Sequence, residues 1–148
     1  MVNPFDPRTV LLEKHAQHVV LIHFPIALFI SGVAFDLIAR GRRTAAWASA
    51  AYLNLTAAAI TVFPALATGL LAWQFVLGGK RLKGLLLLHV IAGGSTAFLV
   101  FLTWILHRRA RKTGTAVLPR YLIAIELLGV GVIALTAHLG GFLSGVNS

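Results

Sequence analysis

Four long apolar runs follow one another along the chain, separated by short basic or glycine-containing breaks. A helix needs about 20 apolar residues to cross the hydrocarbon of a bilayer, and each run supplies them. We therefore predict an all-α integral membrane protein that folds as an up-down-up-down four-helix bundle. The predicted spans cover about residues 17–39, 45–77, 85–106 and 120–143.

The segments outside the predicted bundle of residues 17–143 are short. Residues 1–16 are mixed and polar, and they lack the basic start, apolar stretch and cleavage site of a secretory signal. The first apolar run is therefore expected to remain as a span. Residues 144–148 form a tail that is too short for a domain.

Composition and charge agree with a membrane protein. Of the 148 residues, 58% are hydrophobic and 11% are charged, whereas soluble domains carry about 25% charged residues. The formal net charge of +9 comes from lysines and arginines that flank the apolar runs. Such residues fix topology and contact anionic lipid head groups, so we expect a lipid bilayer and no nucleic acid as partner. The absence of cysteine excludes disulfides, iron–sulfur ligation and the attachment of c-type haem.

The basic residues also predict an orientation. The breaks after the first and third runs carry 8 lysines and arginines, against 5 in the N-terminal segment and the break after the second run. Cytoplasmic loops are enriched in lysine and arginine. Both termini are therefore predicted to lie outside, on the outer face of a bacterial inner (cytoplasmic) membrane.

Four histidines lie within the predicted spans: His18 and His23 in the first, His89 in the third and His138 in the fourth. An ionisable residue in a spanning segment costs roughly 2.5–3.5 kcal/mol on insertion scales, so it often marks a site. In an up-down bundle, the starts of the first and third spans share a membrane face with the ends of the other two. The four histidines are therefore predicted to gather in one layer near the outer face.

Such a layer suggests a haem. Two imidazoles at matching depth, with little side-chain bulk beside them, can hold a porphyrin between helices. We expect His23 and His89 to ligate the iron of one b-type haem, with His138 as the alternative ligand. The third of these histidines would donate a hydrogen bond to a haem propionate or to a quinone. His18 and the small residue Gly93, one turn after His89, complete the predicted cofactor site.

Two other interpretations of the histidines stay open. Three imidazoles satisfy the ligand count of a copper, zinc or iron ion, although no carboxylate or methionine lies at that depth. Alternatively, the histidines bond to backbone groups that Pro25 and the pair Gly140–Gly141 leave open, and the protein is a cofactor-free anchor. His15 and His107, outside the predicted spans, are interpreted as ordinary interfacial residues.

A second polar layer is predicted about 18–20 Å from the histidines, at a rise of about 1.5 Å per residue. It contains Asp36, Asn54 and Glu126. These residues could form a proton path from the inner face to a haem or quinone. In the structural interpretation, Asp36 and Glu126 instead pair with Arg40 and Arg120 near the interface, and Asp36 with Arg40 has the i, i+4 spacing of a helical ion pair.

Several sequence elements resemble a known family. They are H-x-x-x-x-H-F-P-I-A-L in residues 18–28, T-G-L-x-x-W in residues 68–73, the early histidine of the third span, and T-A-H-L-G-G in residues 136–141. Together they resemble a bacterial four-span membrane family known only as a domain of unknown function. Some relatives in that family are linked to Rieske or c-type cytochrome domains, so the resemblance implies respiratory electron transfer.

We therefore expect a membrane electron-transfer subunit that holds a b-type haem or a quinone near the outer face of a larger redox complex. Its partners would be other subunits of that complex and a peripheral cytochrome or iron–sulfur protein. We expect no catalytic activity from the chain alone. The alternative is a cofactor-free structural or anchoring membrane subunit.

Overall fold

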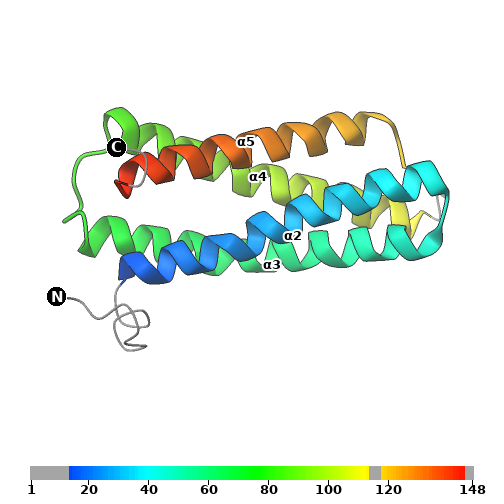
Figure 1. Ribbon diagram of the computed structural model, residues 1–148, viewed down its shortest axis with the longest axis horizontal. Coiled ribbons are helices and arrows are strands. Elements are labelled where there is room, and N and C mark those ends of the chain that lie inside the picture. The colour runs from blue at the N-terminus through cyan, green and yellow to red at the C-terminus, as the bar shows by residue number, and fades with distance from the viewer. Residues whose placement is uncertain (1–13, 114–117, 146–148) are drawn as a thin grey trace.

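The computed structural model describes residues 14–113 and 118–145, and these residues form four helices and no strand (Figure 1). Each helix is long and apolar enough to cross a membrane. The prediction of an all-α bundle of four spanning helices is therefore confirmed. The helices are α2 (Lys14–Arg42), α3 (Ala45–Phe75), α4 (Gly84–Lys112) and α5 (Tyr121–Leu143).

The helices form two antiparallel hairpins, α2 with α3 and α4 with α5, which lie against each other (Figure 1). Small residues allow the close approach of helix backbones that membrane bundles use. A Cβ added to Gly32 of α2 would lie 2.9 Å from the Leu55 side chain of α3. Between the hairpins, a Cβ on Gly129 of α5 would lie 2.7 Å from the ring of Phe29, which is fully buried.

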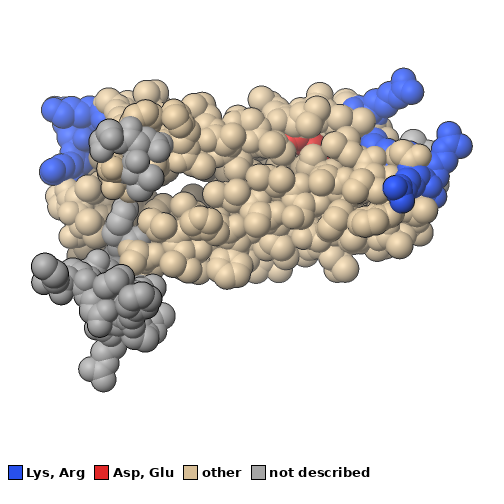
Figure 2. Space-filling view, in the orientation of Figure 1, with Lys and Arg blue, Asp and Glu red and all other residues tan. Residues whose placement is uncertain are grey.

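The interior is apolar along the middle of the bundle, and the outside is apolar as well. Large exposed side chains such as Leu53, Phe98 and Phe63 project from the helices, as expected for lipid-facing positions. On the face shown in Figure 2, lysines and arginines gather at the two ends and leave a band without them between the ends. The chain is thus a multi-pass membrane protein. The buried core consists of Phe29, Val33, Leu55, Ala58, Ala59, Val62, Ala97, Val100 and Ile133.

The helix ends correct two expectations. Helix α4 runs on to Lys112, so the predicted basic loop does not begin at His107. The reason is that no helix-breaking residue occurs in that basic stretch before Gly114. Helix α2 begins at Lys14, before the predicted start of the first span at about residue 17, and it continues through Pro25. Residues 1–13, 114–117 and 146–148 lie outside the described chain.

The hairpins do not keep the same separation along their length. Near the start of α2, this helix lies away from the end of α5 (Figure 1). The space-filling view shows a hollow between the two hairpins there (Figure 2). Toward the end of α2 the two hairpins meet, where Arg40 donates a hydrogen bond to the carbonyl of Leu118. We call the end where α2 and α4 begin the histidine end, and the opposite end the carboxylate end.

Candidate functional site

At the histidine end, two imidazoles each bond through Nδ1 to the other helix of their own hairpin. His18 Nδ1 lies 3.1 Å from the carbonyl oxygen of Ala65 and 3.3 Å from the hydroxyl of Thr68. His89 Nδ1 lies 3.2 Å from the carbonyl oxygen of Thr136. A carbonyl only accepts hydrogen bonds, so Nδ1 is the protonated nitrogen in both rings. In a neutral imidazole, Nε2 then carries the lone pair.

These two histidines occupy equivalent places in the two hairpins. The histidine and the residue whose carbonyl it binds are 47 positions apart in both cases. Each ring also lies over a glycine, because a Cβ on Gly69 would be 3.0 Å from Cε1 of His18 and a Cβ on Gly140 would be 3.2 Å from Cε1 of His89. The two hairpins thus build the same histidine setting.

The other two histidines face away from the interior. His23 is exposed, and its Nδ1 donates to the carbonyl of Val19 in its own helix, at 2.6 Å. Five residues turn a helix by about 500°, so His23 lies about 140° around α2 from His18. It lines a shallow depression of about 330 Å³ on the outer side of α2 together with Phe24, Ala27 and Leu28.

His138 is also exposed, and its ring stands edge-on to Phe142 with 4.9 Å between the centroids. Gly93 is half-buried, and a Cβ there would be in ordinary contact with the Thr136 methyl group at 4.0 Å, so it packs on α5. The structure therefore does not turn His23 or His138 toward the interior with His89. The residue whose setting matches that of His89 is His18.

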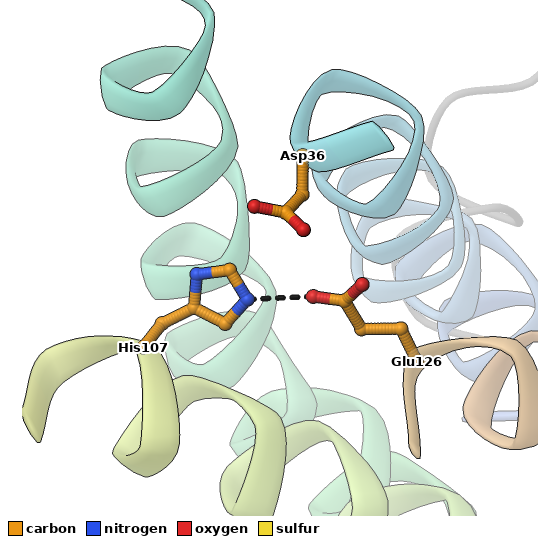
Figure 3. Close-up of side chains that lie close together, drawn as sticks. All are labelled: Asp36, His107 and Glu126. Carbon is orange, nitrogen blue, oxygen red and sulfur yellow. Dashed lines mark hydrogen bonds and ion pairs between the residues drawn. The ribbon is translucent and has the colours of Figure 1, made fainter. Parts of the chain in front are cut away.

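At the carboxylate end, three ionisable side chains from three helices meet in the interior (Figure 3). They are Asp36 of α2, His107 of α4 and Glu126 of α5, which we call the Asp–His–Glu cluster. Their side chains are almost fully buried, with residue exposures of 1%, 2% and 0%. Nε2 of His107 lies 2.6 Å from Oε1 of Glu126. One ligand atom of each residue lies within 4.8 Å of the others.

The surroundings of the cluster confirm one predicted pair and correct another. Asp36 accepts a hydrogen bond from Nε of Arg40, as the i, i+4 spacing predicts. The partner of Glu126 is His107 rather than Arg120, because Glu126 points into the bundle and not toward the interface. Asn54 donates to the carbonyl of Ala50 in its own helix, at 2.9 Å.

Three buried atoms at this end have no hydrogen-bond partner within residues 14–113 and 118–145. They are Oε2 of Glu126, Oγ1 of Thr103 and Nη2 of Arg40. Thr103 is fully buried and lies one helical turn before His107. Buried polar atoms are almost always hydrogen-bonded. These three atoms could therefore form further bonds for which the described residues supply no partner.

His107 is the residue that sequence reasoning missed, because it is the first residue of a basic run that was predicted to be a loop. A signal was present in the spacing. Asp36 follows His18 by 18 positions, and His107 follows His89 by the same number. Eighteen residues make five helical turns, so each pair lies on one helix face with about 27 Å between its members. This spacing places Asp36 and His107 at the same depth.

Comparison with known proteins gives a family match. The family model described as predicted membrane protein (DUF2231) matches residues 14–146, which is nearly the whole chain. No curated protein and no solved structure matches the chain.

Proposed function

The chain belongs to the DUF2231 family of predicted membrane proteins, and we propose that it is a membrane electron-transfer subunit that holds a b-type haem between its two hairpins at the histidine end. His18 and His89 would be the axial ligands. The observation that carries this proposal is the matched pair of Nδ1-to-carbonyl hydrogen bonds, one in each hairpin.

That hydrogen bond is what a ligating histidine requires. A histidine that binds a metal through one ring nitrogen usually donates the other N–H to a carbonyl or carboxylate, which fixes the tautomer and the ring plane. The carbonyls of Ala65 and Thr136 take this role for His18 and His89. Both rings are held over a glycine, so their orientation is set before any ligand binds.

The shape of the bundle favours one ligand shared by both histidines. His18 lies on the same face of α2 as Asp36, and His89 lies on the same face of α4 as His107, by the five-turn spacing. At the carboxylate end these two faces come together in the cluster. At the histidine end the hairpins diverge and a hollow opens, which suits a planar group inserted between them (Figure 2).

The protonation of the rings favours haem over quinone as the occupant. A quinone carbonyl needs a hydrogen-bond donor, whereas Nε2 of a neutral imidazole that donates through Nδ1 carries a lone pair. A lone pair is what the iron of a b-type haem accepts, and the bound haem would supply reversible one-electron chemistry. The side chains of His18 and His89 would hold the group between the hairpins.

The charge distribution supports a location near the outer face. Most described lysines and arginines lie at the carboxylate end, which the positive-inside tendency assigns to the cytoplasm of a bacterial cell. The histidine end and the haem would then lie outside, within reach of a peripheral cytochrome or iron–sulfur protein. The chain would act with other subunits of a membrane redox complex.

Visible absorption of the protein produced under haem-replete conditions and purified in detergent tests the proposal. We expect a Soret band and an α band that dithionite sharpens, with one haem per chain. His18→Ala and His89→Ala should each abolish haem retention, whereas the exposed His23→Ala and His138→Ala should retain it. A colourless wild-type protein that does not take up added haemin would contradict the proposal and leave a cofactor-free membrane anchor.

A further inference from the structure

We propose that the Asp–His–Glu cluster is a binding site for a divalent metal ion of the zinc class, separate from the haem site and independent of it. Asp36, His107 and Glu126 would each supply one ligand. The three residues come from three different helices and from both hairpins. A bound ion would therefore tie the hairpins together at the carboxylate end.

The donor set is suited to such an ion. One imidazole nitrogen and two carboxylate oxygens are ligands that zinc accepts, commonly as three protein ligands with one position left for water. Bound distances are about 2.0–2.2 Å, so two ligand atoms on one tetrahedral ion lie about 3.3–3.6 Å apart. The observed ligand atoms all lie within 4.8 Å of one another. Side-chain shifts of about 1 Å bring them into range. The ion would replace the proton between Nε2 of His107 and Oε1 of Glu126, which lie 2.6 Å apart, and these two atoms would separate.

Buried atoms without hydrogen-bond partners in the described chain support a cation site. Oε2 of Glu126 is buried in the cluster and accepts no hydrogen bond within the described chain. The fully buried Thr103 hydroxyl, one turn from His107, likewise has no partner there. A carboxylate oxygen buried without a donor is costly, and a metal ion would bind it directly.

The net charge of the cluster also favours a bound cation. With a neutral imidazole, the carboxylates of Asp36 and Glu126 and the guanidinium of Arg40 carry a formal net charge of −1 in a spanning region. Such a charge is expensive in a membrane unless a cation compensates it. Arg40 donates hydrogen bonds to the carboxylate of Asp36 and to the carbonyl of Leu118, and the second bond is 2.8 Å long. Arg40 therefore holds the Asp36 carboxylate in place. Ligating carboxylates are commonly fixed by such outer hydrogen bonds.

The competing occupant is a proton shared between His107 and Glu126, which lie 2.6 Å apart. A proton also compensates the charge, but it leaves Asp36 without a bond to the other two residues. Metal binding and proton sharing therefore differ in whether all three residues are needed. A zinc titration of the wild type and of variants at these positions can therefore distinguish metal binding from proton sharing.

The experiment uses the full chain in detergent after treatment with EDTA. Zinc binding is followed by equilibrium dialysis with elemental analysis, and Co²⁺ is titrated as a visible probe of ligand geometry. We expect one Zn²⁺ per chain and a visible Co²⁺ spectrum of a low-coordinate nitrogen and oxygen site. Glu126→Gln and Asp36→Asn should each weaken zinc binding by at least about tenfold.

Controls separate this site from chance binding to surface histidines. His23→Ala and His138→Ala remove exposed imidazoles and should leave affinity and stoichiometry unchanged. Loss of zinc in these variants, or less than a tenth of an equivalent bound by the wild type, would overturn the proposal. If a cluster variant fails to fold, the wild-type titration decides alone. Haem content is measured in parallel, so failure of one site is distinguishable from failure of the other.

Discussion

At the histidine end, each half-buried imidazole bonds to a backbone carbonyl of its own hairpin, whereas at the carboxylate end Asp36 of one hairpin lies close to the bonded pair His107 and Glu126 of the other. The residues at both ends come from the same faces of α2 and α4. The difference lies in where their partners are. Bonds within a hairpin leave the hairpins free to diverge, and at the carboxylate end the bond from Arg40 to the carbonyl of Leu118 joins them.

This contrast explains why one bundle can contain an open end and a closed end. At the carboxylate end, the Asp–His–Glu cluster and the bond from Arg40 to Leu118 connect α2 to α4, α5 and the segment before α5. At the histidine end, the glycine contacts hold the rings without joining the hairpins. The closed end fixes the relative position of the helices, and the open end offers a space for a ligand.

The largest effect is expected when the cluster loses one partner. His107→Ala leaves the Glu126 carboxylate buried and unpaired, which should lower the free energy of unfolding by about 3–5 kcal/mol. The double variant His107→Ala/Glu126→Leu removes both polar groups and should recover much of that loss. Denaturant unfolding in detergent with EDTA present measures both, with His23→Ala as control. A double variant no more stable than the single one would show that the two residues are not coupled.

A smaller effect is expected where the hairpins pack without polar groups. Gly129→Ala places a methyl group 2.7 Å from the Phe29 ring, and such overpacking costs about 1–3 kcal/mol. The matched control is Gly131→Ala in the same helix, because a Cβ there meets no atom within 4 Å. Thermal unfolding of the two variants should differ by several degrees. Equal stabilities would show that Gly129 is not needed for contact between the hairpins.

At the histidine end, substitution of a glycine should affect ligand binding more than stability. Gly140→Ala brings a methyl group to 3.2 Å from the His89 ring and Gly69→Ala brings one to 3.0 Å from the His18 ring. Each ring must then turn away from its carbonyl, and haem affinity should fall roughly tenfold. Haem titration followed by absorption measures this change. The control Gly94→Ala faces open space, and a similar loss there would argue against the site.

The smallest effect concerns a single hydrogen bond between the hairpins. Trp104 Nε1 donates to the Thr56 hydroxyl of α3 at 3.1 Å, and Thr56→Val removes that acceptor. Bonds between membrane helices average about 0.6 kcal/mol, so a loss of this size is expected in the unfolding free energy. Thr61→Val is the control, since the Thr61 hydroxyl bonds within its own helix. If the two variants have the same unfolding free energy, the bond between Trp104 and Thr56 makes no net contribution to stability.

The helices could be predicted because a spanning segment must be apolar over a fixed length. Depth could be predicted too, since the rise per residue places Asp36 and Glu126 near one level. The face of each side chain could not be predicted for the histidines. His18 and His23 are only five positions apart, and a choice between them depends on which side of α2 contacts α3. The spacing of hydrophobic residues does not indicate which face of a helix points inward, because lipid-facing and core-facing positions are both apolar.

His107 shows a different limit. Its neighbours Arg108 and Arg109 made the segment read as a loop, although basic residues also occur in the last turns of a helix. In the structure, α4 keeps its helical course, so the basic residues extend outward while His107 stays on the inner face. Its partner Glu126 could not be identified from sequence either. Their contact depends on which faces of α4 and α5 meet within their hairpin.

The electron paramagnetic resonance spectrum of the oxidised, haem-loaded protein tests the central claim most directly, namely that His18 and His89 face one shared space between the hairpins. Two imidazoles on one iron produce a low-spin ferric signal. The account predicts this signal for the wild type and for His23→Ala, and its loss in His18→Ala and in His89→Ala. A high-spin wild-type spectrum, or a low-spin signal that persists without His18, would contradict it.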